Sequence, residues 1–193
     1  MIKKNNGDEM RIQLMGIALL ITSSLLAGQS GPYIGIDAGN LKLNATVTSG
    51  ANTYKGYESD PAYTLKAGYS FNDNNRLYTF YQYVDTDVSS ASLKQYGIGY
   101  DYFIGESTFK PFIGILAGRI NTKVDNTSNK FDISGNFVGV QAGLSYSLNT
   151  NLSVEGGYRY LDYSNVDGLE SVDNVNVESD SAQSWFAGIT YKF

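Results

Sequence analysis

The sequence predicts an all-β chain that forms an eight-stranded antiparallel up-and-down transmembrane β-barrel. Three observations predict it. Apolar side chains alternate with small or polar ones in short stretches throughout 31–193, as in strands that face lipid on one side and a narrow lumen on the other. The connections between these stretches alternate between short and long. An apolar run near the N-terminus has the features of a secretory signal peptide.

The N-terminal segment, residues 1–30, is predicted to be that signal peptide. Arg11 precedes an uncharged apolar run over 14–28, which is shorter than the roughly 20 residues of a membrane-spanning helix. A retained anchor helix is the alternative. Two acidic residues precede Met10, which is unusual for a basic leader, so Met10 is an alternative start of translation. Cleavage would leave residues 31–193 as a single outer-membrane barrel domain.

The first four predicted strands are Tyr33–Leu43, Ala62–Phe71, Arg76–Val84 and Leu93–Phe103. In the first strand, Ile34 and Ile36 share one face, but the phase shifts near Asn40, which predicts a bulge or an early strand end. The second strand alternates Tyr and Leu with Thr, Lys and Gly. The third is aromatic on both faces, so either face could point inward. The fourth alternates tyrosines with Gln95, glycines and Asp101.

The last four predicted strands are Phe109–Ile120, Val138–Leu148, Leu152–Leu161 and Ser184–Phe193. In Phe109–Ile120, isoleucines lie on one face and a lysine and glycines on the other, and Phe112 and Leu116 are also expected inside. The second is the clearest, because Val, Ala, Leu and Tyr alternate strictly with Gly, Gln and Ser. The third sets Glu155 and Arg159 against leucine, valine and tyrosines.

The final strand combines an apolar face with a C-terminal aromatic residue. Trp185, Ile189 and Tyr191 share the apolar face, and the chain ends on Phe193. Phe186 breaks the otherwise polar opposite face. This arrangement is typical of a strand with lipid outside and a polar lumen inside.

The predicted connections fall into two classes. Three short turns are rich in Asn, Gly and Ser: Asn72–Asn75, Ile104–Thr108 and Asn149–Asn151. Four longer segments are predicted to be loops: Asn44–Asp60, Asp85–Ser92, Asn121–Asp132 and Asp162–Gln183. Short periplasmic turns opposite long extracellular loops are typical of an outer-membrane barrel with both termini in the periplasm. The competing structure is a soluble lipocalin-type barrel, which would have an apolar lumen and a polar exterior.

Eight strands enclose a lumen just wide enough for its own side chains, so a filled lumen is expected. The charged residues predicted to face it are Lys66, Asp101, Lys110, Glu155, Arg159 and Lys192. Glu155 and Arg159 lie four residues apart on one strand, about 13 Å at the usual rise. We therefore expect them to pair with neighbours such as Lys110, Lys192 or Asp101 rather than with each other. Structural pairing is the favoured interpretation, and a proton or ion path is the alternative.

Composition excludes several kinds of chemistry. The chain contains no His and no Cys, which rules out serine–histidine triads, thiol nucleophiles and metal sites that need these ligands. We therefore expect no enzymatic activity and no cofactor. The formal net charge of −5 makes nucleic acid an unexpected partner.

The richest group of carboxylates lies in the last predicted loop, which has no Lys or Arg. Its members are Asp162, Asp167, Glu170, Asp173, Glu178 and Asp180. A solvated acidic loop is the favoured interpretation. Weak binding of a hard cation, bridging to lipopolysaccharide phosphates, is the alternative, although the spacing matches no EF-hand.

Three segments carry a family resemblance: Tyr33-Ile-Gly-Ile-Asp-Ala-Gly39, Gly156-Gly-Tyr-Arg-Tyr160 with Leu161-Asp-Tyr163, and Gly188-Ile-Thr-Tyr-Lys-Phe193. They resemble the first strand and last hairpin of the OmpA-like and opacity-protein family of eight-stranded outer-membrane β-barrels, and the resemblance covers about the whole mature chain. It implies assembly by the barrel-insertion machinery of the outer membrane. The insertion signal would be Trp185, Ile189, Tyr191 and Phe193.

Two classes of function follow from these expectations. In the first, the protein has a structural or adhesive role, and its surface loops contact outer-membrane lipids, lipopolysaccharide, an extracellular ligand or a host surface. In the second, it is a narrow porin-like channel for ions or small solutes. The limited lumen of eight strands favours the first.

Overall fold

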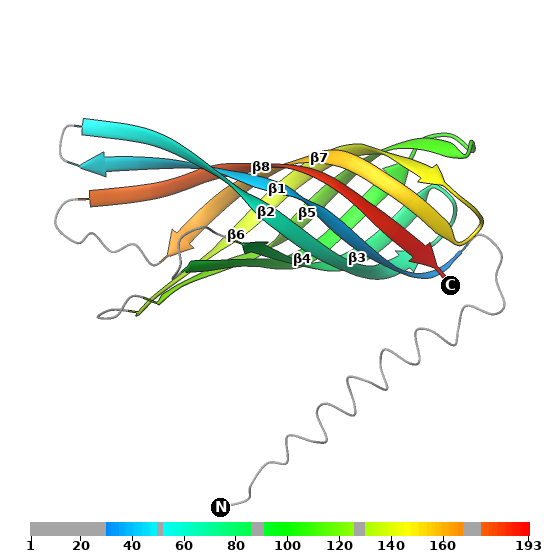
Figure 1. Ribbon diagram of the computed structural model, residues 1–193, viewed down its shortest axis with the longest axis horizontal. Coiled ribbons are helices and arrows are strands. Elements are labelled where there is room, and N and C mark those ends of the chain that lie inside the picture. Colours follow the sequence, from blue (N-terminus) through cyan, green and yellow to red (C-terminus); the bar gives the residue numbers. More distant parts are fainter. Residues whose placement is uncertain (1–29, 50–51, 86–90, 126–129, 168–174) are drawn as a thin grey trace, which may run out of the picture.

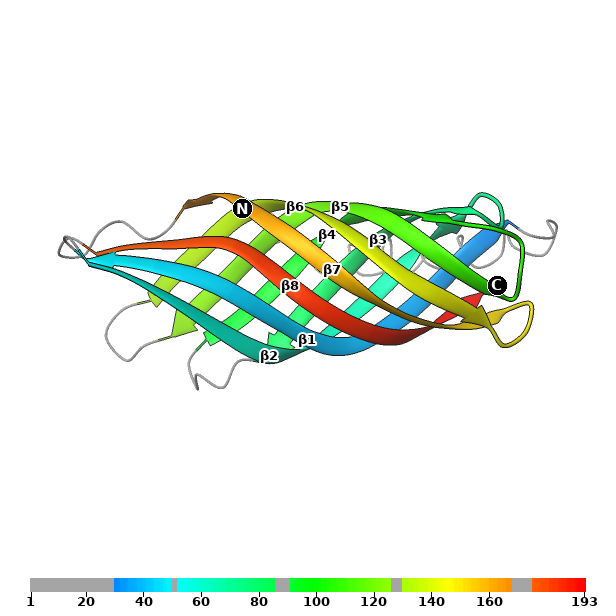
Figure 2. The same cartoon turned by 90° about the horizontal axis from the view of Figure 1, so that it is seen from above.

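A computed structural model of the chain describes residues 30–49, 52–85, 91–125, 130–167 and 175–193. Eight antiparallel strands form one closed barrel in which each strand pairs with the next and the last pairs with the first (Figures 1 and 2). The strands are β1 (Gly31–Ser49), β2 (Asn52–Ser70), β3 (Asn75–Asp85), β4 (Ala91–Phe103), β5 (Phe109–Asp125), β6 (Lys130–Ser147), β7 (Leu152–Asp167) and β8 (Val175–Lys192). The predicted fold class is confirmed.

Large apolar side chains cover the outer wall of the barrel. Ile36, Ile115 and Val138 are about 60% exposed, as expected for residues that contact lipid. Aromatic residues lie near both ends of this wall, and Tyr102 and Tyr191 are close to the strand ends at the short turns. Exposed apolar surface on this scale is typical of a membrane-facing wall and not of a soluble barrel. Over the described ranges, no helix is long and apolar enough to cross a bilayer.

The three short turns and both ends of the barrel chain lie at one end of the molecule, on the right in Figure 1. Two turns are closed by asparagine side chains. Asn72 Oδ1 accepts hydrogen bonds from the backbone N–H groups of Asn74 and Asn75, and Asn149 Oδ1 accepts the same from Asn151 and Leu152. The short turns were predicted within one residue of their observed bounds. This end is periplasmic in an outer-membrane barrel.

Three of the four predicted long loops, all but Asp85–Ser92, are mostly strand, and the prediction of loops there was wrong. β1 continues to Ser49 and β2 begins at Asn52, so nearly all of the first predicted loop belongs to a ladder. The other three are also shortened, because β4 begins at Ala91, β5 extends to Asp125, β6 begins at Lys130, β7 extends to Asp167 and β8 starts at Val175. Beyond the bilayer a strand has no lipid to face, so the apolar half of the pattern disappears while backbone pairing continues.

The predicted phase shift near Asn40 was also wrong. Alternation continues through this residue, which faces outward while Leu41 is buried inside. Asn40 Oδ1 accepts a hydrogen bond from the backbone N–H of Trp185. The register irregularity lies later, between Asn44 and Ala45 in the pairing with β8. The outward Asn40 therefore marks the edge of the apolar wall, and the alternation of inward and outward side chains does not change there.

The ambiguous third strand has one clear inward face. Its buried side chains are Arg76, Tyr78, Phe80, Gln82 and Val84, while the residues between them are exposed. Residues 1–29 of the predicted signal peptide lie outside the described part of the chain.

Candidate functional site

A network of six buried charges crosses the middle of the lumen. It contains three carboxylates and three cations, so the formal charge of the network is zero. Its members are Asp37 on β1, Lys66 on β2, Arg76 on β3, Asp101 on β4, and Glu155 and Arg159 on β7. Burial of an unpaired charge is costly, so a balanced set is the arrangement that a closed lumen tolerates.

Glu155 is the centre of this network. Its Oε1 and Oε2 accept hydrogen bonds from the two terminal nitrogens of Arg76 at 2.5 and 2.8 Å, and Oε2 also accepts one from Lys66 Nζ at 3.2 Å. β3 and β7 are four strands apart in the barrel, so the Arg76–Glu155 pair spans the lumen. A bidentate pair of this kind fixes geometry as well as charge.

Arg76 also holds a second carboxylate. Its Nε and one terminal nitrogen contact Asp101 Oδ2 at 2.9 and 2.8 Å. The other oxygen of Asp101 accepts a hydrogen bond from Gln141 Nε2 at 2.5 Å. The guanidinium carbon of Arg76 lies 4.7 Å from the ring centre of Phe103 and 5.2 Å from that of Tyr33. Arg76 is thus enclosed by carboxylates and aromatic rings.

The rest of the network is looser. Lys66 Nζ lies 2.9 Å from Asp37 Oδ1, and Arg159 lies 3.9 Å from Asp37 Oδ2. These are ion pairs without hydrogen-bond geometry, since neither oxygen of Asp37 has a hydrogen-bond partner among the described groups. Arg159 Nε donates to Gln141 Oε1 at 3.1 Å, and its guanidinium lies over the ring of Phe186.

The structure brings four of the six predicted lumen charges together. Lys66, Asp101, Glu155 and Arg159 belong to the network. Glu155 and Arg159 each pair with other residues, as expected, but Lys110, Lys192 and Asp101 were the wrong partners to name. Their partners come from strands across the lumen, which alternation along one strand does not reveal. Sequence analysis also missed Asp37 and Arg76. Asp37 lies opposite Ile34 and Ile36 in the alternation, a signal that could have found it.

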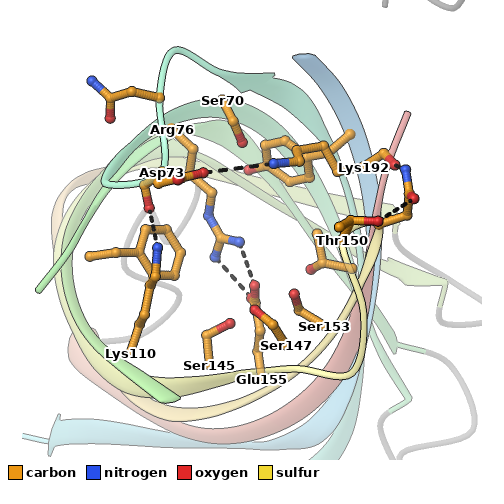
Figure 3. Close-up of a pocket in the computed structure, with 15 residues that line it drawn as sticks. Ser70, Asp73, Arg76, Lys110, Ser145, Ser147, Thr150, Ser153, Glu155 and Lys192 are labelled. Carbon is orange, nitrogen blue, oxygen red and sulfur yellow. Dashed lines mark hydrogen bonds and ion pairs between the residues drawn. The ribbon is translucent and has the colours of Figure 1, made fainter. Parts of the chain in front are cut away.

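Lys110 and Lys192 lie at the periplasmic mouth instead. Lys110 Nζ donates to the backbone carbonyl of Asp73, and Lys192 Nζ lies 3.9 Å from the Asp73 carboxylate. They edge a pocket of about 100 Å³ whose floor is the Arg76–Glu155 pair (Figure 3). Hydroxyl groups dominate its wall, from Ser70, Ser145, Ser147, Thr150, Ser153 and Thr190. At about 30 Å³ per water, this pocket has room for about three water molecules.

The extracellular half of the lumen is filled by apolar side chains. Phe137 lies between Phe80 and Tyr163, with ring centres 6.2 and 5.9 Å away. The cluster also includes Leu41, Val84, Leu93, Leu116, Ile120 and Leu161, all buried. Polar groups are also buried in this layer: Gln95 Nε2 donates to the hydroxyl of Tyr163 at 2.7 Å, and Gln82 Nε2 donates to Thr64 Oγ1 at 2.9 Å. Asp60, paired with Leu41 in the ladder, is 3% exposed. The buried charge network therefore lies toward the periplasmic half, while the extracellular half combines apolar packing with isolated buried polar groups.

The residues of the predicted insertion signal line one outward face of β8. Trp185 is 65% exposed and its ring packs at a tilt against Tyr158, with ring centres 4.8 Å apart, and Ile189 and Tyr191 are also exposed. The ring of Tyr191 packs edge-on against Phe193 at 5.1 Å. The whole set therefore faces lipid.

The predicted acidic loop is largely not a loop. Asp162 and Asp167 lie in β7, and Glu178 and Asp180 lie in β8, while Glu170 and Asp173 fall outside the described residues. Backbone pairing continues here beyond the bilayer, where the apolar half of the strand pattern has ended. Within the described residues, no group of three or more acidic side chains could hold a metal ion.

Comparison with known proteins agrees with this architecture. The family model for the outer membrane protein beta-barrel domain matches residues 14–193. The crystal structure of Neisserial surface protein A superposes with a TM-score of 0.63 at 24% identity and covers 85% of this chain and 99% of that chain. A search of curated proteins returned no match.

Two Pseudomonas aeruginosa structures give the same result. The N-terminal β-barrel domain of OprF has a TM-score of 0.56 at 14% identity and covers 83% of this chain and 97% of that chain. The outer membrane protein OprG has a TM-score of 0.55 at 18% identity and covers 86% of this chain and 98% of that chain. At these identities the likeness shows the fold alone. The predicted kinship with eight-stranded outer-membrane barrels is confirmed, and the chain belongs to the outer membrane protein β-barrel domain family.

Proposed function

We propose that this protein is a sealed outer-membrane barrel that presents its extracellular strands to a partner at the cell surface, without enzymatic activity. In this proposal a cleaved signal peptide directs it to the periplasm, and the outward face of β8 serves the insertion machinery. The barrel provides the anchor and the strands beyond the bilayer provide the interaction.

The observation that carries the proposal is a three-stranded ribbon of β8, β1 and β2 beyond the barrel. β2 pairs with β3 only from Ala62 onward, so residues 52–61 pair with β1 alone. β8 pairs with β7 only from Ser181 onward, so residues 175–180 also pair with β1 alone. Figures 1 and 2 show the three strands extending together at the end opposite the C-terminus.

Such a ribbon has a backbone edge on each side that pairs with no other described strand. An unpaired edge offers N–H and C=O groups to an extended segment of another protein, which can add to the sheet as a further strand. Natural sheets usually protect edges of this length, so two edges without a described pairing strand support an interaction role.

The filled lumen supports the sealed barrel and argues against the porin-like alternative. An ion would have to separate the Arg76–Glu155 pair and then cross the apolar cluster around Phe137. Entry of a charge into such a layer costs several kcal/mol or more. The absence of His and Cys from the sequence supports the proposal of no enzymatic activity.

Removal of the ribbon tip tests the proposal. Residues 46–55 can be replaced by an Asn-Gly turn, because Ala45 and Gly56 are paired and a two-residue turn can join them. Cells that display the full chain should adhere to a panel of immobilised host-cell and matrix proteins more than cells lacking it, and the shortened variant should lose this adhesion. Retained heat-modifiable gel mobility would show that its barrel is intact. Equal adhesion with and without the protein would contradict the proposal.

A further inference from the structure

The lipid-facing wall has an apolar groove across β4, β5 and β6. The groove has a volume of about 690 Å³ and is bounded by Ile98, Ile115, Val138, Val140 and Tyr160. Its floor includes the small outward side chain of Ala117. A short side chain between larger ones leaves a recess in the wall, and an acyl chain is the kind of apolar group that such a recess accepts. Smaller apolar recesses lie elsewhere on the wall, so the neighbouring cations are what distinguish this one.

Two cations lie directly above this groove on the extracellular side. Arg119 is opposite Tyr96 in the β4–β5 pairing, and Lys94 is the next outward residue of β4. Arg119 is exposed and Lys94 half-buried, and neither has an ion-pair or hydrogen-bond partner among the described side chains. Asn121 is paired with Lys94, and Asn136 is paired with Arg119. Both asparagines face outward, as the two cations do.

The groove and the cations are continuous along the strands. On β5 the next outward residue below Arg119 is Ala117, and on β6 the next below Asn136 is Val138. Successive outward residues lie about 7 Å apart, so Arg119 is about 7 Å beyond Ala117 and Lys94 is about 13 Å beyond Ile98. A molecule seated in the groove would reach Arg119 first, with Lys94 one step further toward the extracellular side. Arg and Lys at this height are the residues that bind phosphate oxygens.

We propose that this surface is a site for one phosphorylated lipid of the outer leaflet, with an acyl chain in the groove and a phosphate at Arg119 and Lys94. Asp162 lies on the β7 side of the groove and would repel the phosphate. The headgroup is therefore confined to the β4–β5 side. The site does not depend on the ribbon of β8, β1 and β2, so the two proposals can fail separately.

Binding of purified lipid A to the full-length protein in phosphate-free detergent tests this site, with retained lipid counted by native mass spectrometry. Bis-phosphorylated lipid A should bind more tightly than its dephosphorylated form. Arg119→Gln and Lys94→Gln should each weaken binding about fivefold, which corresponds to about 1 kcal/mol per basic residue at an anionic lipid surface. Asp162→Asn should strengthen it.

Lys42→Gln is the matched control, because it removes one cation from β1, four strands around the barrel from β5. It should leave lipid A binding unchanged. All variants should keep heat-modifiable mobility, since these residues lie on the outer wall. Equal affinity for the phosphorylated and dephosphorylated lipids, or an equal loss in Lys42→Gln and Arg119→Gln, would overturn the site and leave only non-specific lipid contact.

Discussion

The two halves of the lumen fill the same narrow space by different chemistry. Toward the periplasm, six buried charges neutralise one another around Arg76 and Glu155, and a hydroxyl-lined pocket lies beyond them. Toward the extracellular side, aromatic and aliphatic side chains pack around Phe137, and the polar groups among them are isolated or hydrogen-bonded in pairs such as Gln82 with Thr64. The first half depends on mutual satisfaction of charges, while the second depends on close packing. Removal of one group should therefore have different consequences in each.

The largest effect is expected from the shared carboxylate of the polar half. Glu155→Gln removes the charge that holds both Arg76 and Lys66, leaving two buried cations with one carboxylate fewer. Breaking a buried pair in this way costs about 3–5 kcal/mol. Urea unfolding from lipid vesicles measures the free energy of unfolding. A loss below about 1 kcal/mol would mean that water reaches the network and replaces the carboxylate.

A somewhat smaller effect is expected in the apolar half. Leu161 is 1% exposed within the cluster, and Leu161→Ala removes packing without leaving any charge unpaired. The expected loss of unfolding free energy is about 3 kcal/mol, from lost burial and the cavity left behind. The loss should be unaffected by salt in the unfolding buffer. A strong salt dependence would indicate that this half is also polar and hydrated, which would contradict the comparison.

The hydrogen bond between Gln95 and Tyr163 sharpens the comparison, because it is a polar contact inside the apolar half. Gln95→Leu leaves the Tyr163 hydroxyl without this donor, at an expected cost of about 1–3 kcal/mol. Combining it with Tyr163→Phe removes both partners and should recover most of the loss. Unfolding measurements on the single and double variants give the coupling. Simple additivity of the two losses would show that the hydroxyl has another partner.

The smallest effect is expected at the periplasmic mouth. Asp73 and Lys192 are about one-third exposed and lie 3.9 Å apart, so water screens their interaction. Asp73→Asn should change the unfolding free energy by less than about 1 kcal/mol. It is also the matched control for Glu155→Gln, since both replace a carboxylate by an amide. Equal losses in the two variants would show that burial does not distinguish these pairs.

Much of the barrel could be predicted from alternation alone. The inward positions of Lys66, Glu155 and Arg159 follow from the period of two, because lipid excludes charge from the other face. Arg76 was missed because its strand is aromatic on both faces. The ion-pair partners were not predictable, since the stagger of the strands around the barrel decides which side chains meet across the lumen.

The extracellular ribbon shows a second limit of the same signal. Residues 44–49 and 52–60 lack an apolar face, so the sequence predicts a loop there, although their backbones form a ladder. Period-two patterns in a membrane barrel report contact with lipid, and they end where the bilayer ends even when the strand does not.

The most direct test of the sealed lumen is the conductance of the purified wild-type protein in a planar lipid bilayer. If the charge network and the apolar cluster close the lumen together, the current should stay at the background of the bare bilayer at all voltages that the membrane withstands. Steady single-channel steps that change in Glu155→Gln would contradict the account, because they would place a continuous ion path through the buried network.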